Sequence, residues 1–274
     1  MISSLRWFVR RHIHYPMKDR MELIKTYSRI YRVSGKFYIY PSSVVFICEE
    51  KKKAFVETLV SDGDMGKDIL RYLAKLRRFD FSKLPLIYPN GLLYAGLIFW
   101  RDVPDTVDGW VEVDIKRAYP RTLYRIGAIN SEDWKRAWLS KRISQSIVIS
   151  LGMMQALRYE LVYQYGELIS ENYGRRSDAY NRVVSQFMLD TFRLNEFVIA
   201  RYVDAFLIRE KDLGNFQNAL RQTGYFGVLK GRLTKVEDLG AIVKFYITEE
   251  GGRYKAWTYS EKQILRIYNS VDAV

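Results

Sequence analysis

This sequence of 274 residues has almost no cysteine and no long apolar run. Cys48 is the single cysteine, which excludes a disulfide framework and a cysteine-based zinc site and favours a reducing compartment. No apolar stretch approaches the length of a membrane span. The N-terminus lacks the long apolar core and cleavage site of a signal peptide and is expected to form a basic amphipathic helix. The absences therefore predict a globular cytoplasmic protein without a membrane span.

Acidic residues are fewer than basic residues. The chain has 44 Lys and Arg residues against 31 Asp and Glu, a net charge of +13. Such an excess favours a polyanionic partner, and nucleic acid is the first candidate. The 21 tyrosines suit base stacking in a basic groove, although ordinary core and surface filling explains them equally well. A hydrophobic fraction of 48% argues against disorder, and the length allows one or two domains.

Hydrophobic periodicity predicts helices and strands without strict alternation, which favours an α+β fold. Residues 84–91 are dense in proline and glycine, so a domain boundary is expected there. Ser131 precedes two acidic residues and is expected to cap the helix that begins at this point. Helices are expected at 1–33, 68–78, 131–152, 153–171, 178–195 and 211–223, and strands at 35–41, 43–48, 110–115, 198–208 and 241–247.

Two aspartates lie at the edges of apolar, β-branched runs. Alternate positions of the run 110–115 are Val or Ile, so Asp114 is expected on the opposite face of the strand, outside the core. Asp204 precedes a second apolar run at 205–208. Carboxylates fixed on two strands are suited to hold divalent cations for nucleotidyl transfer, because the sheet fixes their separation.

The segment Asp-Ile-Lys-Arg-Ala-Tyr-Pro that begins at Asp114 resembles motif A of family B DNA polymerases, written D-x-x-S-L-Y-P. The likeness is to the protein-primed branch of that family, found in phages and linear plasmids. Asp114, Tyr119 and Pro120 match, whereas Arg117 and Ala118 replace the serine and the leucine. The resemblance implies that Asp114 binds both catalytic metals and that Tyr119 packs under the incoming sugar as a gate against a 2′-hydroxyl. The alternative reading of Asp114 is a turn former at the end of a strand.

Motif C of the family, Y-x-D-T-D-S before an apolar strand, is present in degraded form. Aligned on the apolar residues, Asp204 takes the second aspartate, which the resemblance implies is a metal ligand. Tyr202 then stands at the first aspartate, and Ala200 at the initial tyrosine. The chain therefore retains the carboxylate that the chemistry needs most and loses its neighbour, which leaves loss of activity as an open alternative.

Two shorter fragments follow the family's order. Tyr94-Ala-Gly96 resembles the Y-x-G-G/A segment, which contacts the template strand in the family. Lys244-Phe-Tyr246 resembles the K-x-Y motif, which touches the primer terminus. Each tripeptide alone is common in proteins. Four fragments in family order, with matching predicted secondary structure, are much less common by chance.

Motif B of the family is K-x-x-x-N-S-x-Y-G on a fingers helix, where its lysine grips the triphosphate. The best register begins at Lys141, with Val and Ile where Tyr and Gly belong. Arg136 and Arg142 lie near Lys141 in the same predicted helical region, where helical spacing brings basic positions onto common faces. Such a helix beside two metal-binding aspartates is suited to neutralise a triphosphate, and an ordinary solvated basic face is the alternative.

The resemblance covers roughly residues 94–250 and implies a pared-down polymerase. The first ninety residues contain no D-x-E exonuclease constellation, and Asp62 and Asp64 read as loop residues. The interval between motifs A and B leaves little room for strand-displacement insertions. The predicted domains are an N-terminal basic helical and strand region at 1–88, a palm at 89–250 with reduced fingers at about 131–194, and a C-terminal tail or thumb remnant at 251–274.

The sequence thus predicts an α+β fold: a polymerase-like palm with an antiparallel sheet, reduced helical fingers and a small N-terminal α/β region. The resemblance implies a template-directed DNA polymerase without proofreading, in which a primer 3′-hydroxyl attacks a dNTP with the help of two Mg²⁺ ions, or Mn²⁺ in their place. Implied partners are primer–template DNA, dNTP, and a terminal protein or a separate exonuclease or replisome subunit, in the host cell cytoplasm if the protein is viral.

Two alternatives belong to other functional classes. The first is a non-catalytic palm-like replication protein that binds DNA or a replisome partner. The second is an unrelated basic nucleic-acid-binding protein whose motif matches are accidental, since fold and function need not travel together.

Overall fold

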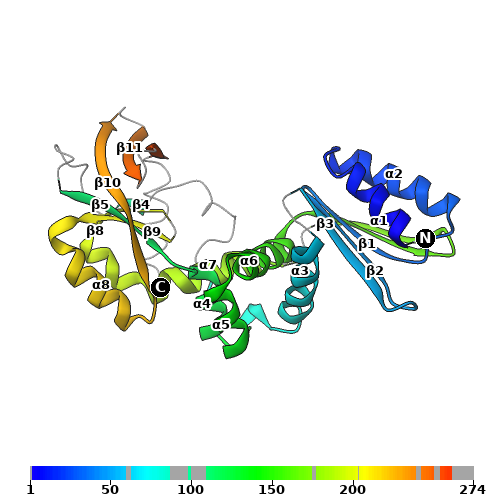
Figure 1. The fold of residues 1–274 in the computed structure, drawn as a ribbon, viewed down its shortest axis with the longest axis horizontal. Coiled ribbons are helices and arrows are strands. Elements are labelled where there is room, and N and C mark those ends of the chain that lie inside the picture. The colour runs from blue at the N-terminus through cyan, green and yellow to red at the C-terminus, as the bar shows by residue number, and fades with distance from the viewer. Residues whose placement is uncertain are drawn as a thin grey trace. The chain divides into compact units, whose positions relative to one another are not determined.

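The chain divides into two compact units, each built on its own antiparallel sheet. The computed structural model describes residues 2–59, 63–86, 98–99, 109–174, 177–202, 204–238, 242–249 and 254–260, with backbone only at 63, 98–99, 199, 202, 234–238, 242–249 and 254–260. The first unit comprises Met1–Asp80 and Ile126–Tyr180, and the second comprises Phe81–Arg125 and Asn181–Val274. Both sheets combine with helices, which confirms the α+β class (Figure 1).

The grouping puts Ile126–Tyr180 with the N-terminal segment, although these residues lie within the range predicted for the palm with its reduced fingers. The predicted ranges 1–88, 89–250 and 251–274 remain predictions.

The elements of the first unit are α1 (Ile2–Arg11), α2 (Met17–Ile30), β1 (Gly35–Tyr40), β2 (Ser43–Cys48), β3 (Lys53–Thr58), α3 (Gly63–Leu76), α5 (Ser131–Leu139), α6 (Lys141–Gln155), β6 (Arg158–Gln164) and β7 (Glu167–Gly174). Its five strands form one sheet of order β3-β2-β1-β6-β7, in which every pairing is antiparallel. Helix α3 packs along α6.

Alternate residues of β1 belong to two hydrophobic cores. Phe37 and Ile39 pack with buried residues of α1 and α2, whereas Tyr38 and Tyr40 pack with residues of α3 and with Met153 of α6. Because successive strand residues point to opposite faces, the sheet is a middle layer between the pair α1 and α2 and the pair α3 and α6. Figure 1 shows α1 and α2 together beside β1 and β2.

The predicted helix at 153–171 is wrong beyond Gln155, because residues 158–174 form the hairpin β6–β7. Leu161 and Tyr163 alternate as buried residues of β6. Tyr165 and Gly166 make the turn, with φ angles of 49° and 89°. Strand-favouring Tyr, Val and Leu residues and this turn outweigh the helical periodicity. The 131–194 region predicted as helical fingers is therefore helical only in part.

The predicted helix at 131–152 is two helices that meet at Ser140. This residue is extended, with φ −120° and ψ 118°, and its hydroxyl oxygen accepts the Ile143 N–H at 3.3 Å, which caps α6. The cap of α5 is Asn130, whose side chain accepts the Asp133 N–H at 2.9 Å. The predicted cap at Ser131 is thus wrong by one residue.

The second unit contains a seven-stranded sheet of order β12-β11-β10-β5-β9-β8-β4. Its pairings are all antiparallel over the described strands. Its main elements are η1 (Phe81–Lys83), β4 (Ile98–Phe99), β5 (Trp110–Ile115), α4 (Ala118–Arg125), α7 (Ala179–Asp190), η3 (Phe192–Phe197), β8 (Val198–Tyr202), β9 (Ala205–Arg209), η4 (Glu210–Asp212), α8 (Leu213–Gln222), β10 (Gly227–Asp238), β11 (Ile242–Glu249) and β12 (Tyr254–Ser260).

The chain order around β5 forms a split β-α-β unit. Strands β9 and β10 both pair antiparallel with β5, and α8 joins them, so they run parallel to each other with β5 between them. Together with β5–α4 and the hairpin β8–β9, the order is β-α-β-β-α-β, the ferredoxin-like arrangement. The chain leaves this unit after α4 and returns in α7.

Strand β5 is buried on both faces except at Asp114. Val113 pairs with Phe206 of β9, and Phe206 contacts Phe216 of α8 with ring centroids 5.4 Å apart. On the opposite face Trp110 is only 8% exposed and Glu112 is fully buried. The expectation that this face of the strand lies outside the core is therefore wrong for Trp110 and Glu112, because alternation shows which residues share a face and not what covers it.

No helix within the described ranges is both long and apolar enough to cross a bilayer.

Candidate metal and nucleotide site

The carboxyl end of β5 brings the two predicted aspartates next to each other in the sheet. Asp114 pairs with Ala205, the first residue of β9, and Asp204 is the residue just before it. The N–H of Ile115 donates to the backbone oxygen of Asp204 at 2.7 Å. The side chain of Asp114 is 34% exposed, and Asp204 is half-buried. Two carboxylate-bearing residues thus meet at one end of neighbouring strands, where solvent reaches them.

Asp204 lies in the short turn that joins β8 to β9. Tyr202, at the family's first aspartate position, is the last residue of β8, and its side chain lies outside the described atoms. Upstream in β8, the fully buried Arg201 lies over the rings of Phe187 and Phe206, 5.2 and 4.6 Å from their centroids. Its guanidinium donates to Thr191 at 2.6 Å. These contacts fix the hairpin against α7 and η3 and so position the turn.

A lysine that the motif search missed reaches the same carboxylate. The register of β10 with β5 shifts between Leu229 and Gly231, so Lys230 is the extra residue of a β-bulge. Its ammonium nitrogen lies 3.5 Å from Oδ2 of Asp114. Bulges near functional sites redirect side chains. The glycine after Lys230 is the only sequence signal of this bulge, because glycine within a strand often marks one.

The loop between β5 and α4 carries an unusual backbone conformation. Arg117 has a φ of 59°, which is uncommon for a residue with a side chain. The N–H of the preceding Lys116 donates to the backbone oxygen of Phe226 at 2.8 Å. Strained residues of this kind gather at binding and catalytic sites. The turn places Tyr119 in the first turn of α4, with its ring 6.4 Å from that of Phe187.

A buried tyrosine joins the elements behind the site. The hydroxyl of Tyr225 donates to Asp190 at 2.8 Å and lies 2.9 Å from the Thr122 hydroxyl. Burial, and then the Asp190 carboxylate, raise the pKa of Tyr225. The Arg125 side chain packs over its ring at 5.2 Å and pairs with Asp190 at 3.4 Å. This network holds α4 and α7 in place on the sheet.

The predicted phosphate-binding residues belong to the first unit. Lys141 is the exposed first residue of α6. Arg142 pairs with Asp68 at 3.3 Å and with Asp64 at 3.5 Å, and Arg136 lies 3.9 Å from Asp68. Two of the three cations are thus shared with carboxylates of α3, which lowers the positive charge that they offer to a phosphate. Their contact with a triphosphate stays a prediction.

The predicted primer residues lie far along the sheet from Asp114. Asp114 pairs with Val228 of β10, whereas Tyr246 pairs with Lys235 and Lys244 with Glu237. From 228 to 235 is seven residues and from 228 to 237 nine, which corresponds to roughly 20–30 Å of strand. The structure therefore does not bring these two positions to the aspartates. The predicted template residues Tyr94 and Gly96 lie outside the described residues.

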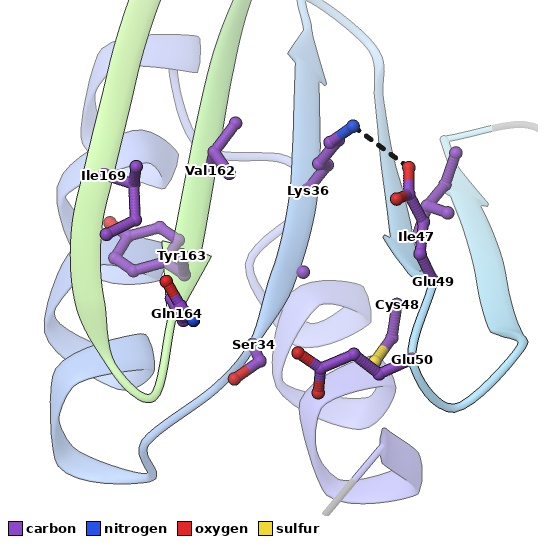
Figure 2. Close-up of a pocket in the computed structure, with 11 residues that line it drawn as sticks. Ser34, Lys36, Ile47, Cys48, Glu49, Glu50, Val162, Tyr163, Gln164 and Ile169 are labelled. Carbon is purple, nitrogen blue, oxygen red and sulfur yellow. Dashed lines mark hydrogen bonds and ion pairs between the residues drawn. The ribbon is translucent and has the colours of Figure 1, made fainter.

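A hollow of about 200 Å³ in the first unit offers a different chemistry (Figure 2). Residues of β1, β2, β6 and β7 surround it. Its one lysine, Lys36, pairs with Glu49 at 3.0 Å, and Glu50 adds a second carboxylate. Cys48 is 2% exposed, so its thiol is not accessible. The balance of charge is unfavourable for an anionic nucleotide, which leaves the end of β5 as the better candidate.

No group of three or more His, Cys, Asp and Glu side chains gathers as a metal site in the described part of the chain. Mg²⁺ usually binds through one or two carboxylates together with water and substrate phosphates. Asp114 and Asp204 are a donor set of that kind.

Comparison with known proteins finds no matching family model, no similar curated protein and no similar solved structure.

Proposed function

We propose that this protein is a template-directed DNA polymerase of a minimal family B type without proofreading. The observation that carries the proposal is the pairing at the end of β5, where Asp114 lies opposite Ala205 and Ile115 bonds to Asp204. Motif A and motif C were matched from the sequence ninety residues apart. In the structure the two motifs lie on adjacent strands of a β-α-β-β-α-β sheet, which is the arrangement that a polymerase palm domain needs.

The residues at this site fit a divalent cation. Their donors are carboxylate oxygens, the ligands that Mg²⁺ prefers, and the Lys230 ammonium beside Asp114 shows that the carboxylate attracts positive charge. Bound Mg²⁺ would supply Lewis-acid activation of the 3′-hydroxyl and stabilisation of the leaving pyrophosphate. Asp114 and Asp204 would hold it, and Mn²⁺ would be a substitute.

Other residues of the second unit orient the substrates in this proposal. Tyr119 packs under the sugar of the dNTP, and its contact with Phe187 limits how far the ring can turn away. When a metal ion binds the Asp114 carboxylate, the Lys230 ammonium is released to contact a substrate phosphate. Lys141, Arg136 and Arg142 remain the triphosphate contacts predicted from the sequence. Primer–template DNA is the polyanion that the charge of +13 favours.

A second candidate is a non-catalytic palm-like replication protein that binds DNA or a replisome partner. Tyr202 at the first aspartate position of motif C favours it, because one carboxylate of the motif is lost. The ion pairs of Arg136 and Arg142 with α3 favour it as well, since they reduce the charge available to a triphosphate.

Primer extension on a primed DNA template with Mg²⁺ separates the two candidates. The polymerase proposal expects extension by the wild type and losses of about a hundredfold or more for Asp114→Asn and Asp204→Asn, because loss of even an outer-shell partner of a metal typically costs about 10–100-fold. Asp212→Asn is the matched control, because Asp212 is in the same unit and caps α8 without a side-chain hydrogen bond. DNA binding without any extension by folded wild type would support the non-catalytic candidate instead.

A further inference from the structure

An apolar groove of about 360 Å³ lies between α1 and α2 in the first unit. Large hydrophobic side chains on its walls remain open to solvent. Trp7 is 61% exposed, Ile30 66% and Tyr31 55%. Exposed apolar side chains gathered in one place mark an interaction surface more often than the same residues scattered singly.

Neighbouring side chains pack against the aromatic rings of this groove. Tyr27 lies between Phe8 and Tyr31, with ring centroids 4.5 and 4.3 Å apart. The guanidinium of Arg11 lies 5.2 Å above the ring of Trp7. Nucleobases bind aromatic residues by stacking on ring faces. The most exposed of the three large side chains is Ile30, which is aliphatic and therefore suits apolar contact and not base stacking.

Four arginines flank the groove. Arg10 and Arg11 follow Trp7 in α1, and Arg29 and Arg32 flank Ile30 and Tyr31 at the end of α2. All four are exposed, and no carboxylate in the described part of the chain forms an ion pair with them. By contrast, Arg6 and Lys25 on the same helices are paired with glutamates. The surface around the groove is therefore complementary to negative charge.

We propose that the groove between α1 and α2 binds the surface of an anionic phospholipid membrane. Trp and Tyr prefer the interface between headgroups and acyl chains, where one end of the ring is apolar and the other wet. Ile30 enters the acyl boundary beside them, and the four arginines contact lipid phosphates. The binding is peripheral and does not depend on the proposed polymerase activity.

Co-sedimentation with lipid vesicles tests this surface. We expect the wild type to bind vesicles that contain phosphatidylglycerol and to bind pure phosphatidylcholine vesicles weakly. Arg10→Gln and Arg29→Gln should each weaken binding about fivefold, in line with the contribution of one basic residue near an anionic surface. Ile30→Glu should weaken it about tenfold or more through lost apolar burial, whereas Trp7→Phe should retain most of it.

Leu139→Glu is the matched control, since Leu139 is 85% exposed on α5 of the same unit. Far-UV circular dichroism checks that each variant is folded. Loss of binding by Leu139→Glu equal to that of Ile30→Glu would overturn the proposal. So would variants that lose binding to a single-stranded oligothymidine and keep vesicle binding, because the groove would then be a nucleic-acid site. Absence of vesicle binding by the wild type would overturn it as well.

Discussion

Asp114 keeps its carboxylate partly exposed in a strand whose other side chains are buried. An ionised carboxylate in a dry core would be costly without a partner, so exposure at the strand end allows this side chain to stay charged. Lys230 and Asp114 are both more than one-third exposed, which limits the contribution of the pair to stability to about 0–1 kcal/mol. We therefore interpret the pair as part of the proposed metal site and not as a stabilising contact.

Replacement of Lys230 should increase metal affinity at Asp114. Lys230→Gln removes a cation that competes for Oδ2, so we expect Mn²⁺ to bind up to about fivefold more tightly, the factor that corresponds to a surface ion pair. Isothermal titration with Mn²⁺ measures the change. Lys211→Gln, an exposed lysine of η4 in the same unit, serves as the control. Weaker metal binding by Lys230→Gln would show that the ammonium does not compete.

Tyr119 should control the choice of sugar. In the proposed site its ring lies against a ribose 2′-hydroxyl, so the wild type should use dNTPs and largely reject rNTPs. Tyr119→Ala should relax that choice by about tenfold or more, because removal of a steric clash of this kind is typically worth 1–3 kcal/mol. Single-nucleotide incorporation with dNTP and rNTP measures the ratio. Equal use of both by the wild type would make Tyr119 a packing residue.

The two aspartates were predictable at the residue scale, and their neighbours were not. Strand alternation placed Asp114 correctly on β5, whereas Asp204, predicted within one strand at 198–208, lies in the turn between β8 and β9. Lys230 could not be found in this way, because its approach to Asp114 depends on a bulge in β10. The burial of Glu112 likewise depends on what covers the sheet, which periodicity does not reveal.

Among the secondary-structure elements, β10 packs closely against β5 and α8, and Gly227 allows this approach. A Cβ on Gly227 would lie 2.6 Å from Cγ1 of Val113 and 2.9 Å from Cδ2 of Leu220. Only glycine allows the strand to approach this closely. Because β10 also carries Lys230, the packing at Gly227 affects the position of a site residue.

Gly227→Ala should destabilise the protein by about 1–3 kcal/mol through overpacking. Gly214→Ala in α8 is its matched control, because a Cβ there meets open space. That change should be neutral or stabilise by about 0.5–1 kcal/mol, as alanine is the better helix former. Urea unfolding of both variants measures the difference. Equal effects of the two substitutions would contradict the close packing of β10.

Only part of the secondary structure was predicted from the sequence. Apolar runs gave β1 and β2, alternation gave β5, and helical segments gave α3 and α8, within a few residues. Strands β3, β10 and β12 were missed. The hairpin β6–β7 was missed because its Leu, Val and Tyr residues also fit a helical face, and only the turn at Tyr165 and Gly166 decides against the helix. The break at Ser140 was missed although serine is a preferred N-cap residue, because no glycine or proline interrupts the helical pattern there.

For the whole molecule, hydrophobic periodicity predicted the α+β class and the composition gave the excess of positive charge, but neither predicted the grouping of distant segments. Residues 126–180 join the N-terminal segment through contacts such as Asp133 of α5 with Arg71 of α3 at 3.1 Å. Asp133 is fully buried and also pairs with Lys75. Long-range pairing of this kind has no local signature in a single sequence.

The net charge of +13 should make nucleic-acid binding sensitive to salt. Each phosphate contacted on a single strand releases counterions, and log K should fall against log salt with a slope of roughly −0.7 per contact. Fluorescence anisotropy with a labelled oligonucleotide at several salt concentrations gives the slope. An affinity that does not change with salt would mean that the basic residues serve another partner or solubility.

Mn²⁺ binding followed by electron paramagnetic resonance in the presence of a dNTP measures whether Asp114 and Asp204 form one metal site. We predict that the wild type binds Mn²⁺, that Asp114→Asn and Asp204→Asn each weaken binding more than about tenfold, and that Asp212→Asn does not. Undiminished Mn²⁺ binding by folded Asp114→Asn or Asp204→Asn would contradict a shared site.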